Sequence, residues 1–191
     1  VRTINPVVAG AKKLLDAALA DPRTVAIRLV PTLHHYKPFD EKVISLCAML
    51  ADKGPMPVQI LLRFDDERHR LPGLNTMTIS PLDILCLTNR FPSLCFVVQG
   101  AVLSEANALA GKRHLERDQE NVWLDTSFLD FMDTLAHATG NLSINRLLFA
   151  TAEPFLYARS NTLHFLSPTL PEEEREKIAW RNAKNLTNGQ H

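Results

Sequence analysis

The sequence has few of the features that mark specialised classes of protein. It contains no apolar run of about 18 residues, so no segment is expected to cross a membrane. Its first 25 residues lack the basic start and apolar core of a signal peptide. The 21 basic residues balance the 21 acidic ones, which gives no sign of a nucleic-acid or membrane partner. A small-molecule substrate is therefore the expected partner.

Cysteine is scarce. Cys47, Cys86 and Cys95 are odd in number, form no CxxC pair and stand in apolar surroundings. They are expected to be buried free thiols in a reducing compartment, and the cytoplasm fits.

Glycine is also scarce, with seven residues in 191, and none is spaced as GxGxxG or as a phosphate-binding P-loop. An open-sheet nucleotide-binding enzyme therefore has no support from motifs.

What is present is an alternation of strand-like and helix-like segments. The chain opens with a helical pattern over residues 7–19, and further helices are expected at 40–53, 81–91, 104–116, 129–139, 159–167 and 171–186. Between them lie short runs rich in β-branched and aromatic residues, which begin near Val25, Val58, Leu94, Val122 and Leu147.

These runs are almost continuously hydrophobic, as the strands of a parallel sheet buried on both faces are. The fold class is therefore α/β, with about five βα units plus a C-terminal helix in a single domain over residues 1–191. Two architectures remain open: a doubly wound open sheet, or part of a (β/α)8 barrel. In both, ligands bind at the carboxyl ends of the strands.

The first two strands end in polar residues. His34 and Tyr36 follow the first strand and are candidates for substrate binding. Arg63 follows the second and offers a guanidinium for a carboxylate, while Glu67 and His69 are candidates for proton transfer. The alternative for the dense run from 63 to 70 is a solvated loop of neutralising charges.

The later strands offer fewer groups. Gln99 is able to hydrogen-bond a substrate but is a poor metal ligand. Asp125 is a candidate catalytic carboxylate, or else ties down a neighbouring loop. Glu153 stands at the polar tip of the last strand and is a candidate for substrate binding.

The C-terminal half, "NVWLDTSFLD", "NRLLFATAEPFLYARS" and "LPEEEREKIAWRNAKNL", resembles the amidohydrolase-related family of metal-dependent hydrolases, the amidohydrolase-2 type. That group includes aminocarboxymuconate-semialdehyde decarboxylase-like enzymes. "VAIRLVPTLHHY" resembles the family's fourth strand, so the chain corresponds to strands four to eight. The resemblance implies a TIM-barrel-like (β/α)8 fold that holds one or two divalent metals of the zinc type.

The metal ligands that the resemblance implies are not found. The family has an HxH pair on strand one, histidines ending strands five and six, and an aspartate ending strand eight. This chain contains no HxH, and Leu61, Gln99 or Gly100, and Ala152 stand at the other positions. Alkyl and amide groups do not replace imidazole and carboxylate around such a cation.

Two hypotheses for the function follow. The first is a hydrolase or decarboxylase for a small carboxylated or cyclic substrate, in a divergent branch without the usual metal site. There, Arg63 holds the carboxylate and His69 or Glu67 transfers protons. The second is a catalytically degenerate barrel that binds a small molecule or a protein. Five strands leave open edges, so completion by a missing N-terminal segment or by another subunit, as in a homo-oligomer, is expected.

Overall fold

The protein's structure, a computed structural model, describes residues 1–54, 56–63, 65, 73–110, 121–129, 142–166 and 170–188. The strands in this part are β1 (Arg2–Thr3), β2 (Ile27–Leu29), β3 (Val58–Leu61), β4 (Phe96–Gln99), β5 (Val122–Asp125) and β6 (Leu147–Leu148). The α-helices are α1 (Ala11–Ala20), α2 (Pro31–His34), α3 (Glu41–Lys53), α4 (Pro81–Arg90), α5 (Leu103–Ala110), α7 (Ala158–Phe165), α8 (Glu172–Glu176) and α9 (Asn182–Asn188). A 3₁₀ helix, η2 (Ile144–Arg146), precedes β6, and a π-helix, η3 (Lys177–Arg181), joins α8 to α9.

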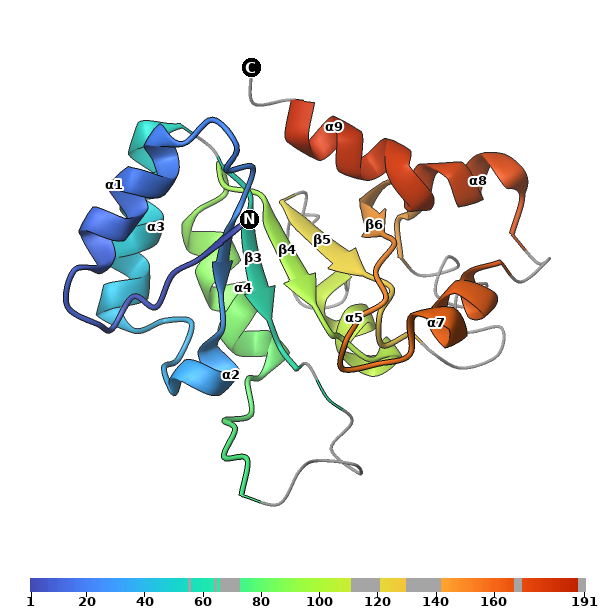
Figure 1. The fold of residues 1–191 in the computed structure, drawn as a ribbon, viewed down its shortest axis with the longest axis horizontal. Helices are drawn as coiled ribbons and strands as arrows, with labels where there is room; N and C mark the ends of the chain where they lie inside the picture. The colour runs from blue at the N-terminus through green and yellow to red at the C-terminus, as the bar shows by residue number, and fades with distance from the viewer. Residues whose placement is uncertain are drawn as a thin grey trace.

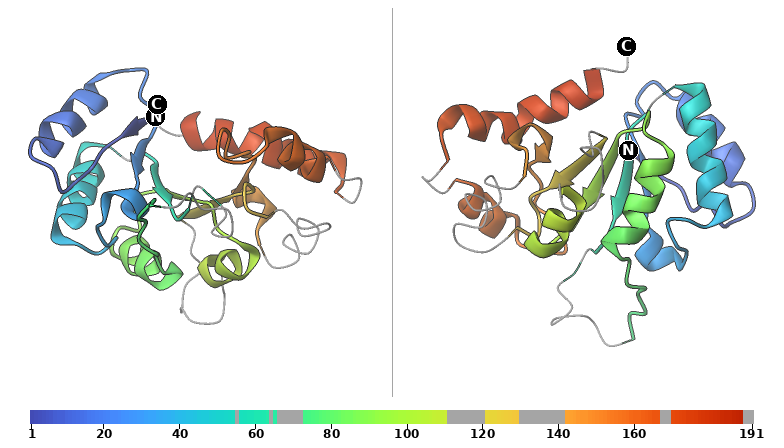
Figure 2. Two further views of the ribbon diagram at one scale, coloured as in Figure 1. Left: turned by 60° about the horizontal axis from the view of Figure 1, so that its bottom comes forward. Right: turned by 180° about the vertical axis from the view of Figure 1, so that it is seen from behind.

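The order of the strands decides between the two architectures. Each strand pairs in parallel with the next one along the chain, from β1 to β6. A doubly wound sheet reverses its strand order at a switch point, and these strands have none. Figure 2 (left) shows α1, α3, α4 and α5 following one another around the outside of the sheet. This is the winding of a (β/α)8 barrel, so the predicted fold class is confirmed.

The first strand was not predicted. Arg2 and Thr3 pair with Ile27 and Arg28, so the sheet has six strands in the described part rather than the expected five. Two residues are too few to show any periodicity, which is why this strand escaped detection. Helix α1 begins only at Ala11, after Gly10, whose φ of 86° lies in the left-handed region.

Helix α4 begins as its sequence predicts. The Ser80 side chain accepts from the Leu82 backbone N–H at 3.2 Å, and the Ser80 N–H donates to the Asp83 carboxylate at 3.4 Å. Pro81 stands at the first helical position, where its missing N–H costs no hydrogen bond. These bonds fix where the helix starts and so direct its apolar face toward the sheet.

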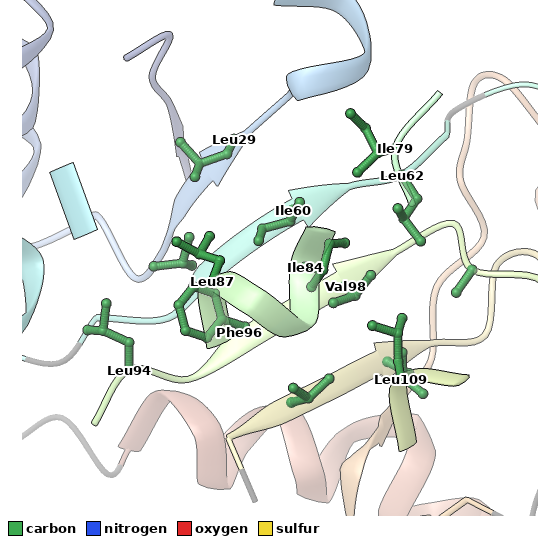
Figure 3. Close-up of a cluster of buried hydrophobic side chains, with 14 of the residues drawn as sticks. Leu29, Ile60, Leu62, Ile79, Ile84, Leu87, Leu94, Phe96, Val98 and Leu109 are labelled. Atoms are coloured by element: carbon green, nitrogen blue, oxygen red, sulfur yellow. The ribbon is translucent and has the colours of Figure 1, made fainter. Parts of the chain in front are cut away.

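The core lies between the sheet and the surrounding helices. Leu29, Ile60 and Val98 are register partners on neighbouring strands, and all three are fully or almost fully buried. Figure 3 shows them with Ile84 and Leu87 of α4 in one cluster of buried side chains. Each such aliphatic side chain stabilises the fold by about 1.5–3 kcal/mol.

Cysteine burial corrects one expectation. All three cysteines are free, as predicted, but only Cys47 is buried. Cys86 is exposed, because it lies on the side of α4 away from its buried residues, and Cys95 is partly buried.

The C-terminal segment is a helix in three parts rather than one. The π-helix places the Ile178 carbonyl where it accepts from the Phe149 N–H at 3.0 Å. Asn182 is buried, and its Nδ2 donates to the carbonyls of Ile144 and Leu147 at 2.7 and 2.8 Å. These bonds fasten the helix to β6, at the sheet's edge (Figure 1). No helix in the described ranges is long and apolar enough to span a membrane.

Candidate functional site at the carboxyl ends of the strands

The alternation of side chains defines a concave face of the sheet, on the side away from α4. Leu29, Ile60 and Val98 face the helices, so the residues one position away on each strand face the opposite side. The concave face carries Arg28, Gln59, Val97 and Trp123 in one row, and Leu61, Gln99, Asp125 and Leu148 in the next. Polar groups of four neighbouring strands therefore share this face.

Arg28 is the cation of this face. It is half-buried, and its Nε donates to the Gln59 Oε1 at 2.9 Å. Among the described residues this is the only hydrogen bond of the guanidinium, and no carboxylate there lies within 4.0 Å of it. The four N–H donors of Nη1 and Nη2 are thus free of protein acceptors in this part of the chain.

Asp125 is the buried carboxylate of the same face. Its Oδ1 accepts from the Gly100 N–H at 3.1 Å, the Ser127 N–H at 3.3 Å and the Ser127 hydroxyl at 2.8 Å. Burial raises the pKa of Asp125, and the hydrogen bonds from Gly100 and Ser127 and the charge of Arg28 oppose that rise. These bonds tie the β4 and β5 loops together, as the structural alternative for Asp125 predicted.

Arg28 and Asp125 lie on the same face of the sheet but on strands that are not neighbours. They lie on β2 and β5, which are separated by two strands and hence by about 14 Å at the backbone. Arg28 nevertheless lowers the pKa of Asp125. The guanidinium reaches as far as Gln59 of β3, to which its Nε donates.

Arg63 does not present a free guanidinium. Its Nη1 and Nη2 donate to the two carboxylate oxygens of Glu105 at 2.8 and 2.6 Å. Its guanidinium carbon lies 5.9 Å from the centre of the Phe128 ring. The structure thus gives Arg63 a protein carboxylate in place of the substrate carboxylate that the sequence suggested.

Glu105 was missed by sequence reasoning. It lies in the first turn of α5, and its Oε2 also accepts from the Val102 N–H at 3.0 Å. An acid in the first turn of a helix that follows a strand was the available signal. Nothing local connects it to Arg63, which is 42 positions earlier.

Gln99 and Gly100 form the end of β4. The Gln99 Oε1 is buried and has no hydrogen-bond partner in the described residues. Gly100 has a φ of 79°, and a Cβ built on it would lie 2.4 Å from the Arg63 carbonyl oxygen. Glycine is therefore required where the ends of β3 and β4 meet.

His34 and Tyr36 lie at the end of β2, and Tyr36 is buried in the core. The Tyr36 hydroxyl accepts from the Val30 N–H at 3.0 Å, and burial raises the pKa of Tyr36. This setting favours a structural role over the predicted contact with substrate. His34 is partly buried, its Nδ1 has no partner in the described part, and burial lowers its pKa.

The tip after β6 is held in an unusual backbone conformation. Ala152 has a φ of 53°, and its carbonyl accepts from the N–H groups of Phe155 and Leu156 at 2.9 and 3.2 Å. Glu153 is exposed. The buried Asn161 of α7 holds the tip, since its Nδ2 donates to the carbonyls of Ser127 and Thr151, each at 3.0 Å.

Glu67 and His69 lie outside the described residues, so their predicted roles in proton transfer remain predictions.

The residues of this face do not fit a divalent metal. Leu61 and Gln99, which stand where the resemblance puts two ligands, are register partners on the concave face. The two ligand positions are thus adjacent, but one holds an alkyl group and the other an amide. In the described ranges no three His, Cys, Asp or Glu side chains come together. Arg28 adds a positive charge, which repels a cation.

Comparisons with known proteins agree on the fold. No protein-family model matches the sequence, and no curated protein matches it. Among solved structures, 2,6-dihydroxybenzoate decarboxylase from Rhizobium superposes with a TM-score of 0.70 at 16% identity, over 97% of this chain and 69% of that one. For 5-carboxyvanillate decarboxylase from Sphingomonas paucimobilis the TM-score is 0.71 at 15% identity, over 97% and 65%. For an uncharacterised TIM-barrel protein from Bordetella bronchiseptica it is 0.71 at 22% identity, over 96% and 64%.

The chain shares the TIM-barrel fold of these structures, and a putative amidohydrolase from Staphylococcus aureus has the same fold. The predicted resemblance is thus confirmed at the level of the fold. The chain spans 64 to 69% of the length of the three structures above. In this fold, Gln99 and Asp125 lie at the carboxyl ends of their strands, where such folds bind their ligands, and Arg28 and Gln59 lie one row nearer the amino ends.

Proposed function

We propose that the chain belongs to a hydrolase or decarboxylase that acts on a small carboxylated or cyclic compound at the carboxyl ends of the barrel strands. The observation that carries the proposal is the concave face itself. A half-buried guanidinium with unused donors and a buried carboxylate, Arg28 and Asp125, share it with the unpartnered Oε1 of Gln99. Buried and half-buried polar groups gathered on one face of a barrel sheet are typical of ligand sites.

Two solved structures with this fold support the choice of substrate class. Their names state that one decarboxylates 2,6-dihydroxybenzoate and the other 5-carboxyvanillate, both carboxylated aromatic compounds. We extend that class to this chain as part of the proposal, with His69 or Glu67 as the proton-transfer group.

The test is a turnover assay of the purified protein with 2,6-dihydroxybenzoate and a panel of related hydroxybenzoates and lactones. We expect turnover of at least one compound, and a loss of about 10²-fold or more in kcat for His69→Ala or Glu67→Gln. A His35→Ala variant is the matched control, because His35 is exposed at the end of α2 and has no assigned role. Unchanged turnover in both test variants would remove the assigned proton-transfer roles.

A second candidate is a barrel that binds a small molecule without transforming it. Leu61 and Ala152 favour it, because neither side chain has chemistry to offer at positions where the resemblance implies metal ligands. Saturable binding of a compound from the panel, with no product formed on long incubation, would support this candidate against the first.

A further inference from the structure

Arg28 interrupts an otherwise apolar strand. Its neighbours in β2, Ile27 and Leu29, are buried against the helices, while Arg28 alone of the three points to the concave face. A guanidinium held half out of water is costly unless its charge and its N–H groups are used. Gln59 satisfies only Nε, and does so with a neutral oxygen.

The nearby acid does not neutralise Arg28 by direct contact. Asp125 responds to the charge of Arg28, but no ion pair within 4.0 Å joins the two, both of which are described. The three hydrogen bonds that Asp125 accepts within the described part all end on Oδ1, and they come from Gly100 and Ser127. Asp125 therefore holds the loops after β4 and β5 in place, and the Nη1 and Nη2 groups of Arg28 remain available to a ligand.

Arg63, which follows the end of β3, serves as an internal comparison. Arg63 is about as deeply placed, and there the protein supplies a carboxylate from Glu105 to both Nη atoms. In the described part of the chain, Arg63 thus has a carboxylate partner and Arg28 has none. Because both Nη atoms of Arg63 donate to Glu105, Arg28 is the arginine of this pair whose Nη groups have no acceptor among the described residues.

We propose that Arg28 binds the carboxylate of an organic ligand through Nη1 and Nη2. The inference rests on the proposed site at the concave face and replaces Arg63, the sequence-based candidate, as its anion-binding group. Two parallel N–H···O bonds suit a planar carboxylate, and a guanidinium keeps its charge at every physiological pH. Gln99 lies on the same face, and its buried Oε1 has no hydrogen-bond partner in the described residues.

The test is a binding titration measured by calorimetry. Benzoate is the probe, and benzamide is its neutral isostere. The variants are Arg28→Gln and Arg28→Lys, and the matched control is Arg90→Gln, in which an exposed arginine in the last turn of α4 is replaced. Circular dichroism and the thermal midpoint of each variant establish that it is folded.

We expect the wild type and Arg90→Gln to bind benzoate alike and benzamide much more weakly. Arg28→Gln should weaken benzoate binding by about tenfold or more, and Arg28→Lys by less, because lysine keeps the charge and loses the fork. Absence of benzoate binding in the wild type, or equal binding in a folded Arg28→Gln, would overturn the inference.

The outcome is separable from that of the proposed function. Benzoate binding through Arg28 in a protein that turns over no compound would leave this inference standing and remove the catalytic proposal. Turnover by Arg28→Gln with an unchanged KM would support the catalytic proposal and remove the inference about Arg28.

Discussion

Replacing Ala152 with glycine should stabilise the protein. Ala152 is a non-glycine residue with a φ of 53°, in the left-handed region that L-residues with a Cβ avoid. The chain is anchored on both sides of this residue, since the Thr151 carbonyl accepts from Asn161 Nδ2 and the Ala152 carbonyl accepts from the N–H groups of Phe155 and Leu156. A change to a negative φ would move these two anchored segments relative to each other, so the strain persists in the folded state.

The magnitude follows from two opposing effects. The left-handed conformation costs a residue with a Cβ about 1–2 kcal/mol, and glycine removes that cost. Glycine also gives the unfolded chain more freedom, which offsets about 0.4–1 kcal/mol of the gain. The net stabilisation is therefore about 0–1.6 kcal/mol, and its midpoint of about 0.8 kcal/mol equals a rise of about 2–3 °C in Tm for a chain of this size.

Urea denaturation followed by circular dichroism measures the change in the free energy of unfolding. A series at position 152 sharpens the test: glycine should be most stable, asparagine next, then alanine, with valine least stable, because asparagine tolerates the left-handed region and β-branched residues do not. Ala17→Gly is the control, since Ala17 is exposed within α1 and glycine should cost about 1 kcal/mol there. Destabilisation by glycine at both positions would refute a positive φ at Ala152.

Three further substitutions test the ends of the strands. Gly100→Ala should cost about 2–4 kcal/mol in urea denaturation, because its Cβ would meet the Arg63 carbonyl at 2.4 Å and its φ is 79°; a cost below about 0.5 kcal/mol would contradict the close approach. Glu105→Ala should lower the free energy of unfolding by about 1–3 kcal/mol, and by much less in a protein that already carries Arg63→Ala, because the ion pair is then absent. Strict additivity of the two substitutions in this double-mutant cycle would argue against the ion pair. Since burial raises the pKa of Asp125 above its usual 3.8, its ionisation costs more in the folded state, so the stability it contributes falls as pH rises from about 4. The stability of Asp125→Asn relative to wild type should therefore increase with pH over the acid range, and a pH-independent difference would contradict the raised pKa.

Local patterns predicted most of the fold. The hydrophobic runs at β2 to β6 identified the parallel strands, and Ser80 with Pro81 located the start of α4, because both signals lie within a few adjacent residues. The strand Arg2–Thr3 and the π-helix Lys177–Arg181 were missed, since each owes its conformation to hydrogen bonds with segments far along the chain.

The site was harder to predict than the fold. Sequence reasoning chose Arg63 for the carboxylate because it follows a strand, but the acid that occupies it comes from another βα unit. Arg28 was passed over because it stands inside an apolar run, although a charge within such a run was itself the signal. Which strand residues face the concave side depends on register, and register is set by pairing between strands.

The most direct test of the account is to observe Arg28 itself during ligand binding. With arginine side chains labelled with ¹⁵N, the Nε–H resonance of Arg28, assigned through its loss in Arg28→Lys, is followed during titration with benzoate and with benzamide. The account predicts a saturable shift of this resonance with benzoate only, while that of Arg63, already paired with Glu105, changes little. A saturable shift at Arg63 with none at Arg28 would contradict it and restore Arg63 as the anion-binding group.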